Sequence, residues 1–273
     1  MMFFAMKLCC FDIDNTLVPF GHRTLSPKTK GALNALLLQG DAVCLASGRP
    51  YVGAKQYLET LVSGNKYEIV SNGSAIYSFE GELLFDQPMK PQDVYYFYDH
   101  YGHIPGVTVY AFGDHNNLLV FGKSPFHLLE ERLNHMTEKT DFLEEDHRSD
   151  ETMKIQKIMV ACDPEISKSL HLTPEEEKHY FASRSAPPFL EILPLGASKG
   201  AMVERLRLYL GLQPEDIYCF GDGDNDISML RRFTSVAPAN ALPSVKEAAT
   251  YVTRDCRDDG VAYAIKDILH LIK

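Results

Sequence analysis

Two aspartates near the start of the chain are the first candidates for chemistry. Asp12 and Asp14 stand two positions apart, directly after the apolar run Leu8–Phe11. On an extended chain, residues i and i+2 point to the same side, so the two carboxylates are expected to lie close together. Like charges at short range repel each other, and they need a cation or a shared proton. The pair therefore indicates a metal site or an acid–base site.

A second acidic cluster follows the apolar run Ile217–Phe220. The segment Gly221–Asp226 reads GDGDND, and its three aspartates offer the hard oxygen ligands that divalent cations prefer. The segment is not an EF-hand, because Ile227 and Phe233 stand where that loop has its Gly and Glu. It is not a dinucleotide fingerprint either, because Asp226 takes the place of the third Gly. We expect a hard-cation site here.

Two other positions are suited to holding an anion. Ser47 follows the apolar run Ala42–Ala46 and precedes a glycine, so a hydroxyl and backbone N–H groups are available to an anion. Lys199 stands at the start of a predicted helix, where the helix dipole disfavours a cation. A lysine placed against that preference indicates an anion nearby.

The elements that would position these residues alternate between strand and helix at both ends of the chain. Continuous apolar runs such as Leu8–Phe11 are typical of parallel strands buried on both faces. Between the two ends of the chain lies a stretch richer in histidine and aromatic residues. Strands are expected there at 107–112, 117–121 and 155–161, and helices at 91–102, 125–138 and 165–178. After Pro187-Pro188 the alternation returns, with a strand at Phe189–Leu193 and a closing helix at Val261–Ile272.

This pattern predicts an α/β fold, a doubly wound parallel sheet with an α+β domain inserted in its middle. The expected core domain comprises residues 1–87 and 187–273, and the inserted domain residues 88–186. In open sheets of this kind, ligands bind at the carboxyl ends of the strands. All the candidate residues above follow strands or begin helices at such positions.

Composition narrows the class of protein. The 273 residues are 45% hydrophobic and 23% charged, which is typical of a globular chain. The net charge of −10 makes nucleic acid or an anionic membrane a poor partner. No apolar run reaches the length of a membrane span, and no secretion signal is evident. The six cysteines lack metal-binding spacing, so we expect reduced core residues and a cytoplasmic protein. Nothing in the sequence indicates an oligomeric state.

Taken together, the motifs resemble those of the haloacid dehalogenase (HAD) superfamily of aspartate-nucleophile phosphatases. Asp12–Thr16 matches the family's first motif, DxDxT, and Ser47 and Lys199 match the second and third. Gly221–Asp226 matches the fourth, GDxxND. The segments 47–50, 71–74 and 198–200 are similar to the Cof-type sugar phosphatases of subclass IIB, and the inserted domain corresponds to their cap by size and position.

The resemblance implies a role for each residue. Asp12 would attack phosphorus, and Asp14 would act as general acid and base. The Mg²⁺ ligands would come from Asp12, the backbone carbonyl of Asp14, Asp222 and Asp226, the last binding through a water or instead supporting Lys199. Contacts with the substrate would come from Ser47, Arg49, Asn72, Lys199 and Asn225. The implied substrate is a small phosphorylated metabolite, either a sugar phosphate or a phosphorylated cofactor.

Three alternatives remain open. A phosphomutase of the same fold would use the same aspartates. A non-catalytic phospho-acceptor module would need neither a second carboxylate nor an inserted domain. An esterase is possible because Gly196–Gly200 satisfies GxSxG, with Ser198 as nucleophile, Asp222 as acid and His270 as base. The esterase hypothesis leaves the first-motif aspartates and Ser47 unexplained, and it places His270 inside the expected closing helix.

Overall fold

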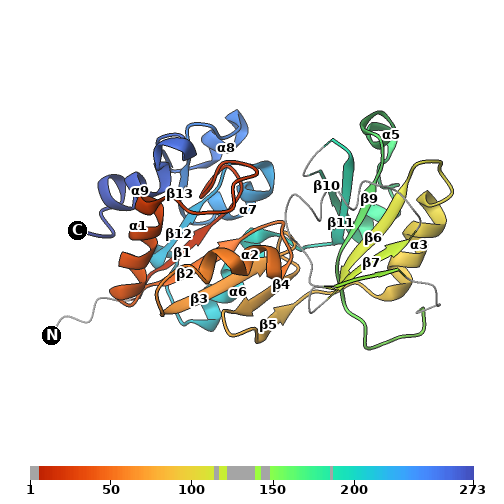
Figure 1. Ribbon diagram of the computed structural model, residues 1–273, viewed down its shortest axis with the longest axis horizontal. Helices are drawn as coiled ribbons and strands as arrows, with labels where there is room; N and C mark the ends of the chain where they lie inside the picture. Colours follow the sequence, from red (N-terminus) through yellow and green to blue (C-terminus); the bar gives the residue numbers. More distant parts are fainter. Residues whose placement is uncertain (1–5, 114–116, 122–138, 143–147, 185–186) are drawn as a thin grey trace. The chain divides into compact units, whose positions relative to one another are not determined.

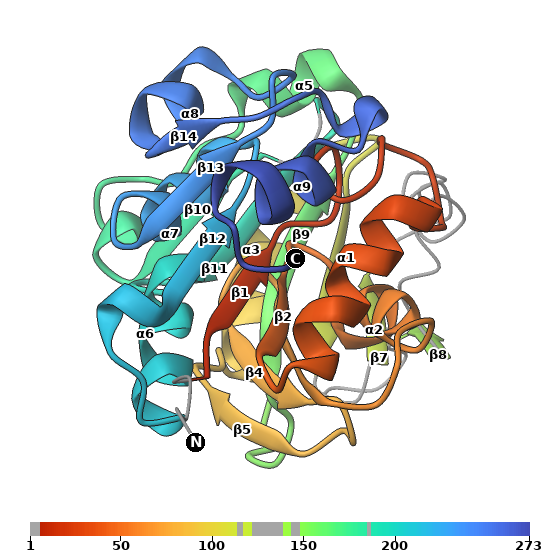
Figure 2. The same ribbon diagram turned by 90° about the vertical axis from the view of Figure 1, so that its left-hand side faces the viewer.

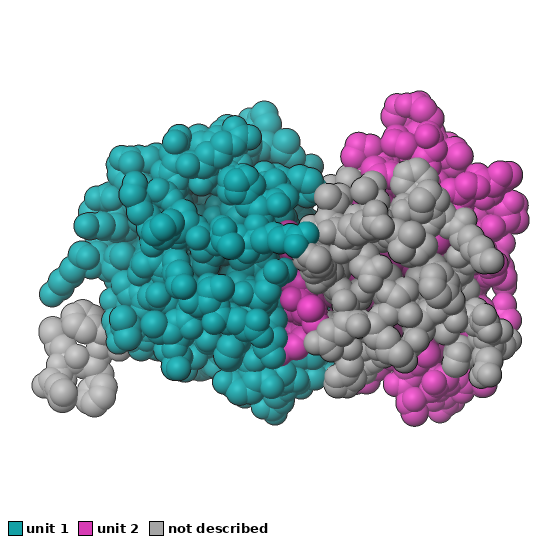
Figure 3. All heavy atoms as spheres, viewed as in Figure 1, with its two compact units in different colours: residues 1–47, 54–84, 198–273 teal, residues 48–53, 85–197 magenta. Residues whose placement is uncertain are grey.

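The computed structural model describes residues 6–113, 117–121, 139–142, 148–184 and 187–273. Its chain divides into two compact units, coloured separately in Figure 3. Unit 1 comprises residues 1–47, 54–84 and 198–273, and unit 2 comprises residues 48–53 and 85–197. The expected helix at 125–138 lies outside the described residues.

Unit 1 is built on an eight-stranded sheet in the order β14-β13-β12-β1-β2-β3-β4-β5 (Figure 1). Its first six strands in that order run parallel, and β4 runs antiparallel to β3. The strands are β1 (Leu8–Phe11), β2 (Ala42–Ala46), β3 (Asn65–Val70), β4 (Ala75–Ser78), β5 (Leu83–Asp86), β12 (Ile217–Phe220), β13 (Thr234–Ala237) and β14 (Tyr251–Val252). The central strands β1 and β2 are buried along their whole length, as their apolar sequences predict.

Helices cover both faces of this sheet. The helices are α1 (Pro27–Leu38), α2 (Tyr51–Leu58), α6 (Lys199–Tyr209), α7 (Ile227–Leu230), α8 (Pro243–Ala248) and α9 (Gly260–Tyr263). Crossovers between parallel strands are right-handed. The chain steps from β1 to β3 in one direction and from β12 to β14 in the other, so α1 and α2 lie on one face and α7 and α8 on the opposite face. Helix α9 packs beside α1 (Figure 2), and α6 packs on α7.

Unit 2 has its own sheet, in the order β10-β11-β9-β6-β7-β8. Its elements are α3 (Pro91–Tyr101), β6 (Thr108–Gly113), β7 (Asn117–Phe121), β8 (Lys139–Phe142), β9 (Ile155–Ala161), α5 (Pro164–Ser169), β10 (Tyr180–Ser183) and β11 (Phe189–Pro194). Side chains alternate between its two faces. Val109 and Ile158 join α3 in one apolar cluster, whereas Tyr110 and Met159 belong to a separate cluster.

The doubly wound α/β fold is confirmed, but several elements differ from expectation. Phe189–Leu193 was expected in the core, yet β11 pairs with β9 and β10 in the sheet of unit 2. Unit 2 accordingly extends to Ala197 instead of residue 186 and includes Gly48–Gly53. An apolar strand sequence alone does not specify which sheet the strand joins.

Two helices are shorter than expected. The helix predicted over 165–178 ends at Ser169, and only a 3₁₀ turn at Glu176–Lys178 follows. Pro174 disfavours helical backbone at Thr173, so a continuous helix over 165–178 is disfavoured. The closing helix continues from α9 through a π-helical turn to Ile268, so His270 lies beyond it, with a positive φ of 51°.

The six cysteines are all buried and unpaired, as their apolar surroundings predict. Within the part of the chain that is described, no helix combines the length and apolar character needed to cross a membrane.

Candidate active site

The predicted site residues of unit 1 follow the carboxyl ends of its central strands. Parallel registers align Phe11 at the end of β1 with Phe220 of β12 and Leu45 of β2. Asp12 continues directly from β1, and the Gly221–Asp226 turn continues from β12. Residues about 200 positions apart in sequence are therefore neighbours at one edge of the sheet.

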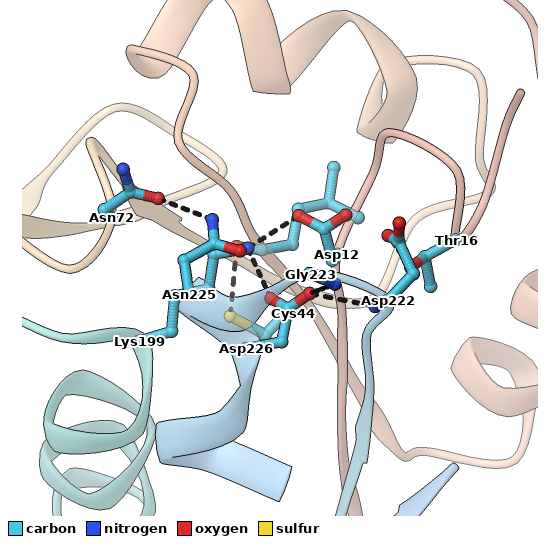
Figure 4. A network of polar contacts seen from close by, with 10 residues as sticks. Asp12, Thr16, Cys44, Asn72, Lys199, Asp222, Gly223, Asn225 and Asp226 are labelled. Atoms are coloured by element: carbon cyan, nitrogen blue, oxygen red, sulfur yellow. Dashed lines mark hydrogen bonds and ion pairs between the residues drawn. The ribbon is translucent and has the colours of Figure 1, made fainter. Parts of the chain in front are cut away.

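Lys199 lies at the centre of this site, between two carboxylates (Figure 4). Its Nζ atom is 2.6 Å from Oδ1 of Asp12 and 2.6 Å from Oδ1 of Asp226. The lysine is completely buried, and so is Asp226. Burial by itself lowers the pKa of Lys199, but the two carboxylates outweigh that effect and raise it. The lysine is therefore a permanent positive charge, and the carboxylates are the anions that its placement at a helix start predicted.

Close backbone packing fixes the position of Lys199. Ser198 is the N-cap of α6, and its side chain accepts a hydrogen bond from the N–H of Ala201. Gly73 has a φ of +99°, and a Cβ there would lie 2.3 Å from the carbonyl carbon of Ser198. A Cβ on Gly200 would lie 2.2 Å from the carbonyl oxygen of Ser228. Both glycines are needed because the start of α6 touches neighbouring backbone on two sides.

Asp226 organises its own turn as well as binding Lys199. Its Oδ2 accepts hydrogen bonds from the N–H groups of Asp222 and Gly223, at 2.9 and 3.0 Å. Its Oδ1 is bound to Lys199. Because both oxygens already have donors, this geometry favours a supporting role for Asp226 over direct bonding to a metal.

Three carboxylates at the site are close enough to share a cation. Oxygens of Asp12, Asp222 and Asp226 all lie within 4.8 Å of one another. Burial and the neighbouring carboxylates raise the pKa of Asp12 against the opposing effect of Lys199. Burial, followed by Asp226, raises the pKa of Asp222 to about 6. Three carboxylates against one ammonium leave excess negative charge, so the donor set fits a hard divalent cation such as Mg²⁺.

Asp14 is placed differently from the other three aspartates. Its carboxylate is not in the group of three, and the residue is half-buried on a hydrogen-bonded turn. The N–H groups of Leu17 and Val18 both donate to the carbonyl of Ile13, which closes this turn. A half-exposed carboxylate beside a buried one suits proton exchange with a substrate or with water.

The side of the site expected to bind phosphate is formed by Ser47, Asn72 and Asn225. Ser47 is buried, its N–H donates to the carbonyl of Ile69, and its carbonyl accepts from the N–H of Asn72. The Nδ2 of Asn225 donates to Oδ1 of Asn72 at 2.9 Å (Figure 4). Asn72 has a φ of 57°, in the left-handed region. Arg49, also predicted to contact substrate, is buried and belongs to unit 2.

Two polar residues that support the site were not predicted by the sequence. Thr16, noted only as part of the first motif, donates its hydroxyl to Oδ1 of Asp222 at 2.8 Å. The side chain of Asn240 donates to the carbonyl of Asn15 and accepts from the N–H of Cys256. Asn240 follows β13 at the same edge of the sheet, and this position after a strand is the sequence feature that could have identified it.

The esterase hypothesis loses its supporting geometry. Ser198 caps its own helix, and Asp222 is bound to Thr16. His270 is exposed, and its ring nitrogen is 3.1 Å from the carbonyl of Lys266. Within the described residues, no hydrogen bond joins these three side chains into a triad.

Comparisons with known proteins agree with this geometry. The family model of haloacid dehalogenase-like hydrolases matches residues 9–265. The chain is 31% identical to the putative phosphatase YxeH of Bacillus subtilis, over 96% of this chain and 98% of that protein. A haloacid dehalogenase-like hydrolase from Bacteroides thetaiotaomicron superposes with a TM-score of 0.83 at 27% identity, covering 96% and 99% of the two chains. The subclass IIB sugar phosphatase BT4131 superposes at 0.73 with 25% identity, covering 97% and 100%. The chain therefore belongs to the haloacid dehalogenase-like hydrolase family.

Proposed function

We propose that this protein is a Mg²⁺-dependent phosphatase that hydrolyses small phosphomonoesters through an aspartyl-phosphate on Asp12. The observation that carries this proposal is the buried Lys199 held 2.6 Å from both Asp12 and Asp226, beside Asp222. Relatives named as phosphatases, and a sugar phosphatase among the similar structures, support the same reaction class.

In the first half of the reaction, a carboxylate oxygen of Asp12 forms a bond to phosphorus as the bond to the substrate oxygen breaks. Asp14 gives its proton to the departing alcohol oxygen. In the second half, Asp14 takes a proton from water, and the oxygen of that water forms a bond to phosphorus. The acyl-phosphate bond breaks, which releases inorganic phosphate and regenerates the Asp12 carboxylate.

Electrostatic stabilisation of the transferring phosphoryl group accounts for most of the catalysis in such reactions. Lys199 keeps Asp12 oriented and offsets negative charge, and Ser47 and Asn225 are the donors for the phosphoryl oxygens. Asp12, Asp222 and the backbone carbonyl of Asp14 would hold Mg²⁺, which would supply the positive charge that lets an anionic carboxylate approach an anionic phosphate. Asp226 fixes both Lys199 and the backbone of the turn.

Unit 2 is, in this proposal, the type IIB cap that selects the substrate, a sugar phosphate or a phosphorylated cofactor. Arg49 and Asn72 are proposed substrate contacts. A reducing compartment such as the cytoplasm is part of the proposal, because all six cysteines are unpaired thiols.

The test is release of inorganic phosphate from a panel of phosphomonoesters. Activity should vanish in chelator and return with added Mg²⁺. Asp12→Asn should be inactive, and Asp14→Asn should lose about 10²–10⁴ in rate. With p-nitrophenyl phosphate, whose leaving group needs no proton, Asp14→Asn should still phosphorylate Asp12. Full activity after metal removal, or in Asp12→Asn, contradicts the proposal. Formation of an isomeric sugar phosphate without phosphate release identifies a mutase instead.

A further inference from the structure

Unit 2 contains an ion pair that is entirely buried. Lys157 of β9 and Glu191 of β11 have side chains only 1% and 2% exposed, and Nζ lies 3.4 Å from Oε1. The ammonium also lies 4.8 Å from the centre of the Phe112 ring, on the strand opposite. Both charges sit on the sheet face that carries Tyr110 and Met159.

Stability alone is a poor explanation for this pair. Burying two charges removes their hydration, and well-packed apolar residues of the same volume are often as stable or more stable. A buried pair of this kind is better explained if its ammonium group holds a neighbouring part of the backbone in place.

Lys157 holds the backbone that follows Ser47. Its Nζ donates to the carbonyl oxygen of Gly48 at 3.0 Å. The described chain has no cis peptide bonds, and in a trans peptide the C=O and N–H groups point in opposite directions. Fixing the carbonyl of Gly48 therefore fixes the direction of the N–H of Arg49. In the same way, the bond from Asn72 N–H to the carbonyl of Ser47 fixes the N–H of Gly48.

These two N–H groups stand next to Ser47 in the chain. Successive backbone N–H groups held in a turn form an anion-binding concavity.

We propose that Lys157 is a positioning residue that orients the backbone N–H groups after Ser47 for binding the phosphoryl oxygens. The inference deepens the proposed phosphatase function and rests on it. Lys157 touches no reacting atom in this scheme. It acts through the peptide between Gly48 and Arg49.

The test compares variants by their affinity for inorganic phosphate in the presence of Mg²⁺, measured by calorimetry. Lys157→Met/Glu191→Gln removes the donor and, together with it, both charges of the buried pair. Glu191→Gln alone keeps the bond from Lys157 to Gly48. Lys154→Met is the matched control, because it removes a partly exposed lysine next to β9 whose partner is Asp86. Unfolding midpoints are measured for every variant.

We expect the double variant to bind phosphate at least tenfold more weakly, with kcat/KM for p-nitrophenyl phosphate reduced by about 10–100-fold, because small misplacements near reacting groups have effects of that size. Glu191→Gln and Lys154→Met should bind phosphate as the wild type does. Wild-type affinity in the double variant, or equal weakening in Glu191→Gln, overturns the inference. If the double variant does not fold, Lys157→Gln/Glu191→Gln, whose amide ends short of Gly48, replaces it with the same outcomes. An inactive wild type refutes the proposed function, whereas the phosphate affinities still decide the role of Lys157.

Discussion

Replacing Lys199 with methionine separates its electrostatic role from its packing role. Methionine has nearly the length of the lysine side chain but carries no charge. The substitution leaves Asp12 and Asp226 buried without the ammonium that lies 2.6 Å from each. Removing one partner of a buried pair costs about 3–5 kcal/mol. At roughly 2–4 °C per kcal/mol for a unit of this size, the unfolding midpoint should fall by about 6–20 °C.

Activity should fall further than stability explains. Loss of one donor to a developing charge typically lowers kcat by about 10²–10³, and Lys199 also orients the nucleophile. Lys199→Met/Asp226→Asn removes one of the stranded charges, so it should recover part of the lost stability but none of the activity. Ser198→Ala, next door, should lose only about 0.5–2 kcal/mol of stability as a missing N-cap and little activity.

The assay is phosphate release from p-nitrophenyl phosphate at a temperature where each variant is folded. Wild-type turnover in folded Lys199→Met would refute the role assigned to this lysine. The same variants are also assayed with a carboxylic ester, and ester hydrolysis that is lost in Ser198→Ala but kept in Lys199→Met would instead support the esterase hypothesis.

Three further predictions concern residues around this site and in the core. Glu68 is fully buried with neither carboxylate oxygen hydrogen-bonded, and burial raises its pKa well above 4.5 against the opposing effect of Lys55. The free energy of unfolding should therefore fall as pH rises from about 4.5 through the raised pKa. Glu68→Gln should remove that dependence when thermal unfolding is compared at pH 5 and pH 8. Gly73→Ala should lower both stability and kcat/KM, whereas Gly40→Ala, with a similar φ and open space around it, should leave kcat/KM unchanged. Thr16→Val removes the hydrogen bond to Asp222, so about tenfold more Mg²⁺ should be needed for half-maximal activity; an unchanged requirement would exclude this role.

The parts of the site that the sequence predicted are those governed by strand ends. An apolar run followed by a polar residue places that residue at the carboxyl edge of a parallel sheet, and Asp12, Ser47 and Asp222 follow that rule. Lys199 was predicted by a different argument, the mismatch between a cation and a helix N-terminus. The carboxylates of Asp12 and Asp226, which Lys199 contacts, are the anions that this argument required.

Contacts that depend on long-range packing were not predictable in this way. Thr16 and Asn240 support the site through hydrogen bonds across more than 200 residues. Thr16 lies in the first motif and Asn240 follows a strand, but neither position identifies the distant group to which the side chain is hydrogen-bonded. The same holds for β11, because its apolar sequence suits either sheet. Only its pairing with β9 and β10 in the folded chain shows that it belongs to the sheet of unit 2.

The charges of Asp12, Asp222, Asp226 and Lys199 explain what a single lysine does in this acidic site. Lys199 is bound on one side to Asp12, the proposed nucleophile, and on the other to Asp226, which shapes the turn that contains Asp222. It therefore links the position of Asp12 to that of Asp222, since Asp226 holds the N–H of Asp222. In the proposed function, a cation bound by Asp12 and Asp222 would add positive charge beside these carboxylates, whose pKa values burial raises, and it would favour their ionised forms. Under this proposal, ionisation of Asp12 and binding of the metal would each favour the other. This dependence is the reason to expect that metal removal abolishes the chemical step itself as well as weakening substrate binding.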